Sequence, residues 1–355
     1  MSRTDDLLND FPPVGTDTWQ ENIAKTLKAK PISDLTWSVD RGVQALALYR
    51  KPAAPFPKSS TKLKESNYWS IAHFVDVQNL KKSNAEILRA LFSGVNVLSL
   101  KINTDLDAKQ LQTLLKGVYT NMVQVFFELE SNVDLETFLK QLENLTGSES
   151  NIRGGCSVEI NQLTKLPETS HSLTYFTCSS TATSPVDSLV DLLNQGRDYL
   201  QKFMQQGHDV DELSQHFRFQ FRLSDSYLLE IARLRAFRRL WWGVLEAYNA
   251  QFPRTPHIWA STHYGDANHK YWNMIAATTQ AMAAAIGGVD TLIVCPAGGY
   301  SVANAFTRRI AVNIQHLLQQ ESYLDRVVDP ASGSYYIENM TIDLQKATWK
   351  RFTNN

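Results

Sequence analysis

The sequence predicts a (β/α)8 barrel, an α/β fold, preceded by an extended N-terminal arm. Short runs rich in β-branched and aromatic residues alternate with longer runs whose apolar residues recur at helical spacing. The alternation begins near residue 68 and supplies eight candidate strands over roughly 250 residues, the usual size of this fold. A doubly wound open sheet gives the same alternation with fewer strands, so the count of eight favours the barrel.

The eight expected strands are short and rich in residues that fit a pleated surface. They span residues 68–75, 95–102, 122–129, 155–160, 173–179, 217–223, 257–263 and 290–296. Helical patterns follow seven of them, at 83–92, 105–118, 133–145, 186–206, 225–250, 270–286 and 301–321. The connection after the fourth strand, residues 161–170, shows no such pattern. Strand–helix–strand order predicts parallel strands joined by right-handed crossovers.

Residues 1–66 differ from the rest because prolines and a run rich in lysine and serine interrupt every long element. The prolines are Pro12, Pro13, Pro31, Pro52, Pro55 and Pro57. A short helix near residues 18–29 and a strand near residues 43–49 are expected. We therefore divide the chain into an N-terminal arm, residues 1–66, and a barrel, residues 67–355. An extended arm of this length normally lies on another surface.

The unit from Thr255 to Glu338 is the clearest part of the pattern. Its first expected helix stops at Gly287-Gly288, because glycine adopts the left-handed conformation beyond a helix end without a steric penalty. A second strand and a second helix follow. Residues 326–338 then read as a tail containing proline, glycine and serine, and no helix is expected after residue 321.

The expected helix at 225–250 is the best defined, because one apolar stripe runs along it. The stripe consists of Tyr227, Ile231, Leu234, Phe237, Trp241, Val244 and Tyr248. Four arginines fall off the stripe or at its edge: Arg233, Arg235, Arg238 and Arg239. We interpret the segment as an amphipathic outer helix of the barrel. Trp241 and Trp242 cannot point the same way, so one of them hints at a protein interface.

Composition and charge argue against several classes of protein. With 35 Lys and Arg against 36 Asp and Glu, the formal net charge is −1, and no basic run suggests nucleic-acid binding. No stretch approaches the roughly 18 apolar residues of a membrane span, and the acidic N-terminus lacks the apolar core of a secretory signal. The three cysteines lack metal-ligand spacing and are expected to be buried reduced thiols, which favours a cytoplasmic protein.

In a (β/α)8 barrel the chemistry lies at the carboxyl ends of the strands. The polar residues expected there are Asp76, Lys101, Asn103, Glu130, Glu159, Asn161, Ser179, Ser180, Thr181, Ser224, Asp225, His263, Tyr264 and Asp266. The cluster whose side chains are best suited to catalysis contains His263, Tyr264 and Asp266. Its histidine could act as a general base or a metal ligand. Polar loops of this kind are common without a metal, and we expect none. Gly298-Gly299 could cradle a phosphate, although two glycines at a turn need no ligand.

Four segments resemble the barrel domain of the methylmalonyl-CoA mutase family, in the family's order and spacing. They read Leu229-Glu-Ile-Ala-Arg-Leu-Arg-Ala-Phe-Arg-Arg-Leu-Trp241, Gln280-Ala-Met-Ala-Ala-Ala-Ile-Gly-Gly288, Arg309-Ile-Ala-Val-Asn-Ile-Gln315 and Arg326-Val-Val-Asp-Pro-Ala-Ser-Gly-Ser-Tyr-Tyr-Ile-Glu338. The resemblance is firm from about residue 185 to residue 352. It implies a barrel of the adenosylcobalamin-dependent isomerases that act on acyl-CoA thioesters.

This sequence departs from the family in the segments that carry the chemistry. Catalytic members have a Gly-Tyr-His motif on the fifth strand, where this chain reads Tyr175-Phe-Thr-Cys-Ser-Ser180. A Gln-Thr-Ser-Gly-Trp segment follows Thr-His after the seventh strand in the family, whereas Thr262-His263 is followed here by Tyr264-Gly-Asp266. The family's Ser-Leu-His-Thr-Asn run at the eighth strand is replaced by Leu292-Ile-Val-Cys-Pro296. No Asp-x-His-x-x-Gly cobalamin motif occurs, and we expect no cobalamin-binding domain.

The resemblance therefore implies the non-catalytic small (beta) subunit of heterodimeric methylmalonyl-CoA mutase, which interconverts methylmalonyl-CoA and succinyl-CoA. We expect no catalytic residue on this chain and no cofactor bound by it alone. A catalytic large subunit would bind adenosylcobalamin, and the arm would lie on that partner. Two alternatives stay open. One is an active acyl-CoA mutase barrel, with His263, Tyr264 and Asp266 at its rim, completed by a separate cobalamin-binding chain. The other is an unrelated barrel enzyme that uses His263 and Asp266.

Overall fold

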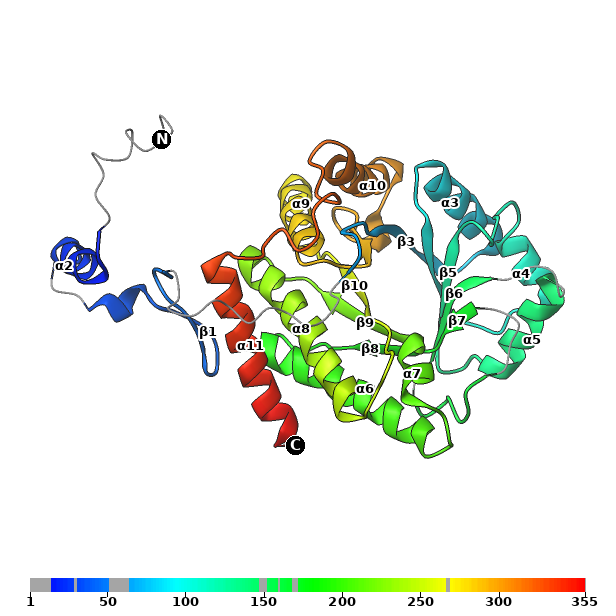
Figure 1. The fold of residues 1–355 in the computed structure, drawn as a ribbon. Coiled ribbons are helices and arrows are strands. Elements are labelled where there is room, and N and C mark those ends of the chain that lie inside the picture. The colour runs from blue at the N-terminus through cyan, green and yellow to red at the C-terminus, as the bar shows by residue number, and fades with distance from the viewer. Residues whose placement is uncertain are drawn as a thin grey trace, which may run out of the picture.

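The chain forms a nearly closed parallel barrel with helices outside it (Figure 1). The computed structural model describes residues 14–28, 31–50, 64–146, 152–158, 160–167, 172–265 and 269–354. The architecture matches the alternation of strands and helices in the sequence. The predicted (β/α)8 fold is therefore confirmed.

All eight expected strands form, each within three residues of its predicted bounds. They are β3 (Ser70–Val77), β4 (Val97–Ile102), β5 (Gln124–Leu129), β6 (Arg153–Ser157), β7 (Ser172–Thr174), β8 (Phe176–Ser179), β9 (Phe217–Arg222), β10 (His257–Ser261) and β11 (Thr291–Ile293). The order is β7-β6-β5-β4-β3-β11-β10-β9-β8, and every neighbouring pair is parallel. β7 and β8 are two parts of one strand interrupted at Tyr175, so the ring has eight strand positions.

The helices that follow the strands lie around the outside of the barrel. They are α3 (Leu80–Phe92), α4 (Ala108–Leu114), α5 (Leu135–Thr146), α6 (Pro185–Met204), the one-turn α7 (Val210–Leu213), α8 (Tyr227–Ala247), α9 (Lys270–Ile286) and α10 (Ala305–Gln320). Local signals set their ends: Ser184 accepts a hydrogen bond from the backbone N–H of Asp187, and Pro185 opens α6. At the end of α9, Gly288 adopts a φ of 79°, as expected of a helix stop.

The main hydrophobic core lies between the strands and the surrounding helices. β9 shows the alternation that produces it, because every second residue of this strand points outward. The outward residues are Phe217, Phe219 and Phe221, all almost fully buried. Phe219 packs on Phe237 and Trp241 of α8, with ring centroids 4.6 Å and 4.7 Å apart. Each ring of this size contributes roughly 1.5–3 kcal/mol on burial.

A helix that was not predicted, α11 (Tyr335–Thr353), covers the outer faces of α8 and α6. Figure 1 shows it in red along the outside of α8. α8 is an outer helix of the barrel, as expected, but α11 covers it, so three of its four arginines are buried. Arg233, Arg235 and Arg238 are each no more than 6% exposed. The apolar residues of α11 recur at helical spacing from Ile337 to Phe352, but the preceding Pro/Gly/Ser segment masked this signal.

Part of the N-terminal arm packs on the barrel of its own chain. The expected helix is α2 (Thr16–Thr26), which has no buried residue and lies away from the barrel in Figure 1. The expected strand is the second strand of an antiparallel hairpin, β1 (Trp37–Asp40) and β2 (Val43–Ala45). β2 packs on α11, and the carboxylate of Asp40 accepts hydrogen bonds from Ser184 and from the backbone N–H of Val186. The hairpin thus caps the start of α6.

Two further expectations from the sequence can be checked in the described residues. Cys156 and Cys178 are buried in strands, and Cys295 is partly buried just after β11; all three are free thiols, as predicted. Burial raises the pKa of the Cys295 thiol. Trp241 is fully buried, whereas the half-exposed Trp242 donates from its indole nitrogen to Glu246 at 2.7 Å. Among the described residues, none of the helices combines the length and apolarity needed to cross a membrane.

Candidate functional site

The charged residues at the carboxyl ends of the strands pair with one another. Lys101, near the carboxyl end of β4, forms an ion pair of 2.6 Å with Glu130. Asn103 donates from its amide nitrogen to Asp76 at 2.7 Å. These partners come from neighbouring strands, because parallel strands end at the same face of a barrel. Each charge or amide therefore already has a partner within the chain.

His263, the central residue of the predicted cluster, is held from three sides. Its Nδ1 lies 2.7 Å from the backbone oxygen of Leu223, and its backbone N–H donates to Gln280 Oε1 at 2.9 Å. Its Nε2 lies 3.7 Å from a carboxylate oxygen of Asp225. Gln280 also donates to Asp225, at 2.8 Å, so the histidine sits in a small polar network. Asp266, the expected acidic neighbour, lies outside the described residues.

The ring of Tyr264 lies against the glycine turn that follows β11. Gly298 and Gly299 both adopt a φ of 87°, a conformation that favours glycine. A Cβ placed on Gly299 would lie 2.4 Å from the Tyr264 ring. The turn therefore needs its glycine for the close approach of this tyrosine. This contact gives the glycine a role that requires no ligand, which is one of the two interpretations left open by the sequence, and phosphate binding stays a prediction.

Side chains fill the centre of the barrel, a feature that the sequence interpretation missed. We call Arg218, Phe126 and Trp259 the axial plug. The Arg218 guanidinium lies 4.8 Å from the centre of the Phe126 ring and 4.4 Å from that of Trp259. The two rings are themselves 4.7 Å apart. These residues come from β5, β9 and β10 and point inward, so they close the axis midway along the barrel.

The charge of Arg218 is balanced inside the barrel. The residue is 1% exposed and donates twice to Thr177 Oγ1, at 3.2 Å and 3.1 Å. Its Nη1 forms a longer ion pair of 3.8 Å with Glu128, whose carboxylate also accepts a hydrogen bond from Ser99. Burial lowers the pKa of Arg218 to about 10, although the charge of Glu128 opposes the shift. Cation–π contacts in such a desolvated place contribute about 2 kcal/mol each.

A second pair of rings lies nearer the rim. Phe74 of β3 packs on Tyr300, with ring centroids 4.9 Å apart. Burial raises the pKa of the Tyr300 phenol well above its usual value. The strand pattern contained a signal for this filled interior, because residues 218, 220 and 222 of β9 are large polar residues at every second position. That alternation predicts large inward side chains.

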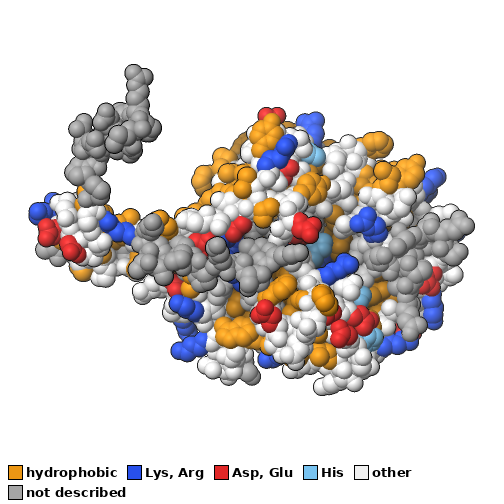
Figure 2. Space-filling view, in the orientation of Figure 1, with side chains coloured by type: hydrophobic (Ala, Val, Ile, Leu, Met, Phe, Trp, Pro, Cys, Tyr) orange, Lys and Arg blue, Asp and Glu red, His pale blue; other side chains and the backbone are white. Residues whose placement is uncertain are grey.

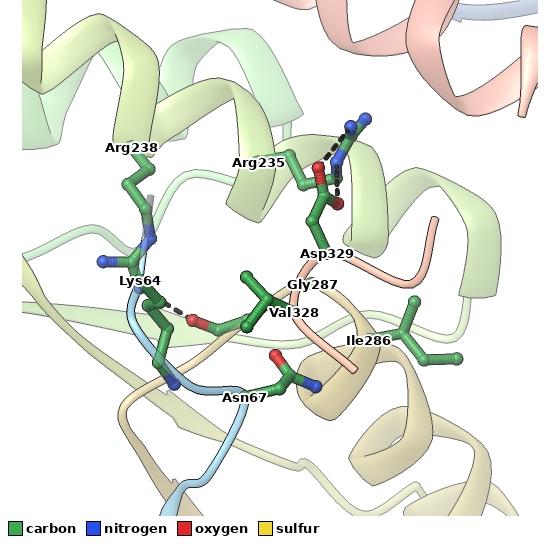
Figure 3. A pocket seen from close by; sticks show the side chains of 9 residues that line it. Lys64, Asn67, Arg235, Arg238, Ile286, Gly287, Val328 and Asp329 are labelled. Carbon is green, nitrogen blue, oxygen red and sulfur yellow. Dashed lines mark hydrogen bonds and ion pairs between the residues drawn. The ribbon is translucent and has the colours of Figure 1, made fainter. Parts of the chain in front are cut away.

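A cluster of buried ion pairs lies between α8, α11 and the amino ends of the strands (Figure 3). Arg235 donates to both oxygens of Asp329, at 2.7 Å and 2.9 Å, and to Glu338 at 2.8 Å. Arg238 pairs with Asp290 at 2.9 Å. We call these residues the arginine network. Four of its members lie in two of the four segments that resemble the mutase family, and Asp290 lies two residues after a third, so those segments hold the scaffold together.

Lys64, near the end of the arm, and Asn67, at the start of the barrel, join this network. Lys64 donates to the backbone oxygen of Val289 at 2.8 Å and lies 3.5 Å from Asp290. Asn67 donates to the backbone oxygens of Ala285 and Leu324. Burial by itself would raise the pKa of Asp290, but Arg238, Lys64 and the hydrogen bond from Ile258 outweigh it and lower that pKa to about 2. The carboxylate is therefore ionised throughout the physiological range.

Within the described residues, no three His, Cys, Asp or Glu side chains are grouped closely enough to hold a metal ion. The rim residues His263 and Tyr264 are brought to one face as predicted, but they bond to the backbone and to the glycine turn respectively. The arrangement can position polar groups. Two serines of the predicted rim donate to carboxylates, Ser180 to Asp191 at 2.7 Å and Ser224 to Glu230 at 2.6 Å.

The chain is similar over most of its length to known proteins of the methylmalonyl-CoA mutase family. The chain is 27% identical to the methylmalonyl-CoA mutase small subunit of Porphyromonas gingivalis, over 98% of this chain and 63% of that protein. It is 25% identical to the small subunit of Propionibacterium freudenreichii, over 98% of this chain and 62% of that protein. A methylmalonyl-CoA mutase of Cereibacter sphaeroides is 22% identical over 94% and 57%. The chain thus spans about three fifths of the length of these relatives.

The family profile described as methylmalonyl-CoA mutase matches residues 177–354, which is half of the chain. The matched region contains α6, α8, α9, α10 and α11, together with the whole arginine network apart from Lys64 and Asn67. Membership of this family removes the unrelated-barrel alternative. The profile match over half of the chain and the relatives named above show that the chain belongs to the methylmalonyl-CoA mutase family.

Proposed function

We propose that this chain is a non-catalytic small subunit that stabilises a catalytic methylmalonyl-CoA mutase chain. The axial plug carries the proposal. A thioester that reaches the rim through the barrel needs an open axis, and Phe126, Trp259 and Arg218 fill the middle of it. Several relatives that match over most of this chain are named small subunits of the mutase.

The rim residues also fit a supporting role better than a catalytic one. Adenosylcobalamin, which the family implies, would have to face polar groups at the strand ends. Here Lys101 is paired with Glu130, His263 is held by Leu223 and Gln280, and Tyr264 lies on Gly299. The residues present do not fit the cofactor, so we assign it to the catalytic partner and derive no reaction step on this chain.

The arm supplies a surface for the partner. Several of its apolar side chains are exposed: Val14, Leu35, Trp37, Leu46 and Leu48. α2 buries none of its residues against this chain. Exposed apolar groups on an extended segment are typical of an interface with another protein. We propose that the described part of the arm outside the β1–β2 hairpin lies on the catalytic chain, in a soluble complex of the cytoplasm.

Co-expression with the catalytic chain of the same source tests this proposal. We expect a one-to-one complex by light scattering, with mutase turnover that is unchanged by His263→Ala or Tyr264→Phe in this chain. The corresponding loss of a substrate-binding residue in the partner should abolish turnover. A chain that stays monomeric beside its partner would contradict the proposal. Turnover of an acyl-CoA by this chain with a separate cobalamin-binding protein would establish the active-barrel alternative.

A further inference from the structure

The ring of outer helices is open between α3 and α10. Most neighbouring helices pack on each other, as at α3–α4, α4–α5, α6–α8, α8–α9 and α9–α10. α3 and α10 both pack on β3 but scarcely touch each other, and a groove of about 660 Å³ lies between them. A volume of this size accommodates several side chains of another molecule.

The floor of the groove is fixed by one ion pair between the two helices and by a histidine contact at each end of it. Glu86 of α3 pairs with Arg308 of α10 and lies 3.0 Å from His73 Nε2 of β3. At the carboxyl end of α3, His316 Nε2 lies 2.7 Å from the backbone oxygen of Ser93. The groove therefore has a defined shape before any partner arrives, which lowers the entropic cost of binding.

The groove carries an excess of positive charge. Three arginines line it, Arg89, Arg308 and Arg309, against the single carboxylate of Glu86, so its formal charge is +2 with His73 neutral. Glu86 is already engaged by Arg308. Arg89 and Arg309 form no ion pair with any described residue. Arg89 donates from Nε to the backbone oxygen of Ala85 at 3.1 Å, and the Arg309 guanidinium lies 6.0 Å from the centre of the Phe306 ring. The remaining N–H groups of the two exposed arginines can bind carboxylates from outside.

Two exposed phenyl rings line the groove beside these charges. Phe92, at the carboxyl end of α3, is 91% exposed, and Phe306, in the first turn of α10, is 49% exposed. Figure 2 shows hydrophobic side chains in orange over this part of the molecule. The α10 residues that line the groove run from Ala305 to Val312 and those of α3 from Glu86 to Phe92, which is about 10 Å of helix axis on each side. Exposed rings beside arginines are typical of surfaces that bind other proteins.

We infer that the groove between α3 and α10 binds an acidic polypeptide segment of a partner protein, which places a large apolar side chain against Phe92 or Phe306. The acidic side chains of the segment pair with Arg89 and Arg309. The apolar side chain removes exposed phenyl surface from water. A length of about 10 Å suits two turns of an amphipathic helix or about three residues of extended chain. This inference goes beyond the proposed subunit function and does not depend on it.

A random library of displayed 12-residue peptides, selected on the full-length chain, tests the inference. We expect the selected peptides to be enriched in Asp and Glu together with Phe, Leu or Trp. A synthetic representative should bind the double variant Arg89→Glu/Arg309→Glu at least tenfold more weakly. Phe306→Ser, which leaves the charges in place, should also weaken it severalfold. Arg254→Glu provides the matched control, because this arginine is exposed, lies away from the groove and should leave affinity unchanged.

Three outcomes would overturn the inference. One is a selection that gives no binders. Another is a set of peptides without an acidic excess, or with equal affinity for the double variant. The third is an RNA oligonucleotide that binds more tightly than the peptides and loses affinity in the same double variant, which would assign the groove to nucleic acid. Urea unfolding of each variant verifies that the fold is kept.

Discussion

The side of the barrel covered by α11 and the rim at the carboxyl ends of the strands differ in how they use charge. In the arginine network, Arg235 and Arg238 are nearly inaccessible and join segments far apart in the chain. At the rim, Lys101 and Glu130 are each about 40% exposed and join two adjacent strand ends. A buried pair that loses one member leaves an uncompensated charge in the interior. An exposed charge that loses its partner is solvated by water instead.

This difference shows which part of the molecule resembles the family. The segments that match the family are mostly those of the arginine network, α8, α9 and α11, and they specify a scaffold. The segments that depart from the family's motifs lie at the carboxyl ends of the strands. A family assignment for this chain therefore follows from its scaffold, and its activity has to be decided from the rim and the axial plug.

The largest effect is expected from Arg235→Ala. Removing this guanidinium leaves Asp329 and Glu338 close together without their shared partner, and Thr341 loses a hydrogen bond. We expect the free energy of unfolding to fall by about 3–5 kcal/mol. Urea unfolding followed by circular dichroism measures it. Arg254→Ala, an exposed arginine, serves as control and should change stability by less than about 0.5 kcal/mol. Equal losses of stability in Arg235→Ala and Arg254→Ala would contradict the difference between buried and exposed charges.

The charge of Asp290 should make the network sensitive to acid. The pKa of this carboxyl is about 2 in the folded chain, below the model-peptide value of about 3.9 expected after unfolding. The unfolded chain therefore binds more protons between these values, so stability is full above pH 4 and falls as the pH drops toward 2. Asp290→Asn should cost roughly 2 kcal/mol at pH 7 and much less at pH 2. Urea unfolding at the two pH values gives the difference.

A smaller effect is expected at the contact between α6 and α8. A Cβ on Gly196 would lie 2.4 Å from the ring of Trp241, which is fully buried. Gly196→Ala should therefore force the indole to move and destabilise the fold by about 1–3 kcal/mol, despite the higher helix propensity of alanine. Gly207→Ala would not be a fair control, because that glycine has a positive φ. Gly243→Ala is suitable, since its nearest side-chain neighbour is 3.7 Å away.

The smallest effect is expected at the rim. Lys101→Met removes the exposed ion pair to Glu130, the contact that raises the pKa of Lys101 in the folded chain. We expect a loss of at most about 1 kcal/mol, screened further by salt. Thermal unfolding at low and high ionic strength measures the loss of stability and its dependence on salt. A loss of several kcal/mol would mean that the rim, like the arginine network, is part of the scaffold.

Much of the fold could be predicted because local patterns and tertiary structure agree in it. The eight strands were located to within three residues, and the expected helices at 186–206 and 270–286 match α6 and α9 closely. The candidate site was less predictable. His263 and Tyr264 do lie at the rim, but the hydrogen bond to Leu223 and the contact with Gly299 join residues far apart in sequence. Hydrophobic periodicity along the sequence does not predict such contacts.

The sequence by itself determined the order of strands and helices, the helix stops and the membership of a family, because hydrophobic periodicity and glycine or capping residues act over a few positions. Only the tertiary structure decided that α11 covers α8, that the arginines of α8 are buried, and that Arg218 closes the axis with Phe126 and Trp259. Each of these depends on which surfaces meet after folding, and the burial of a charge is settled by partners that lie up to about a hundred residues away along the chain.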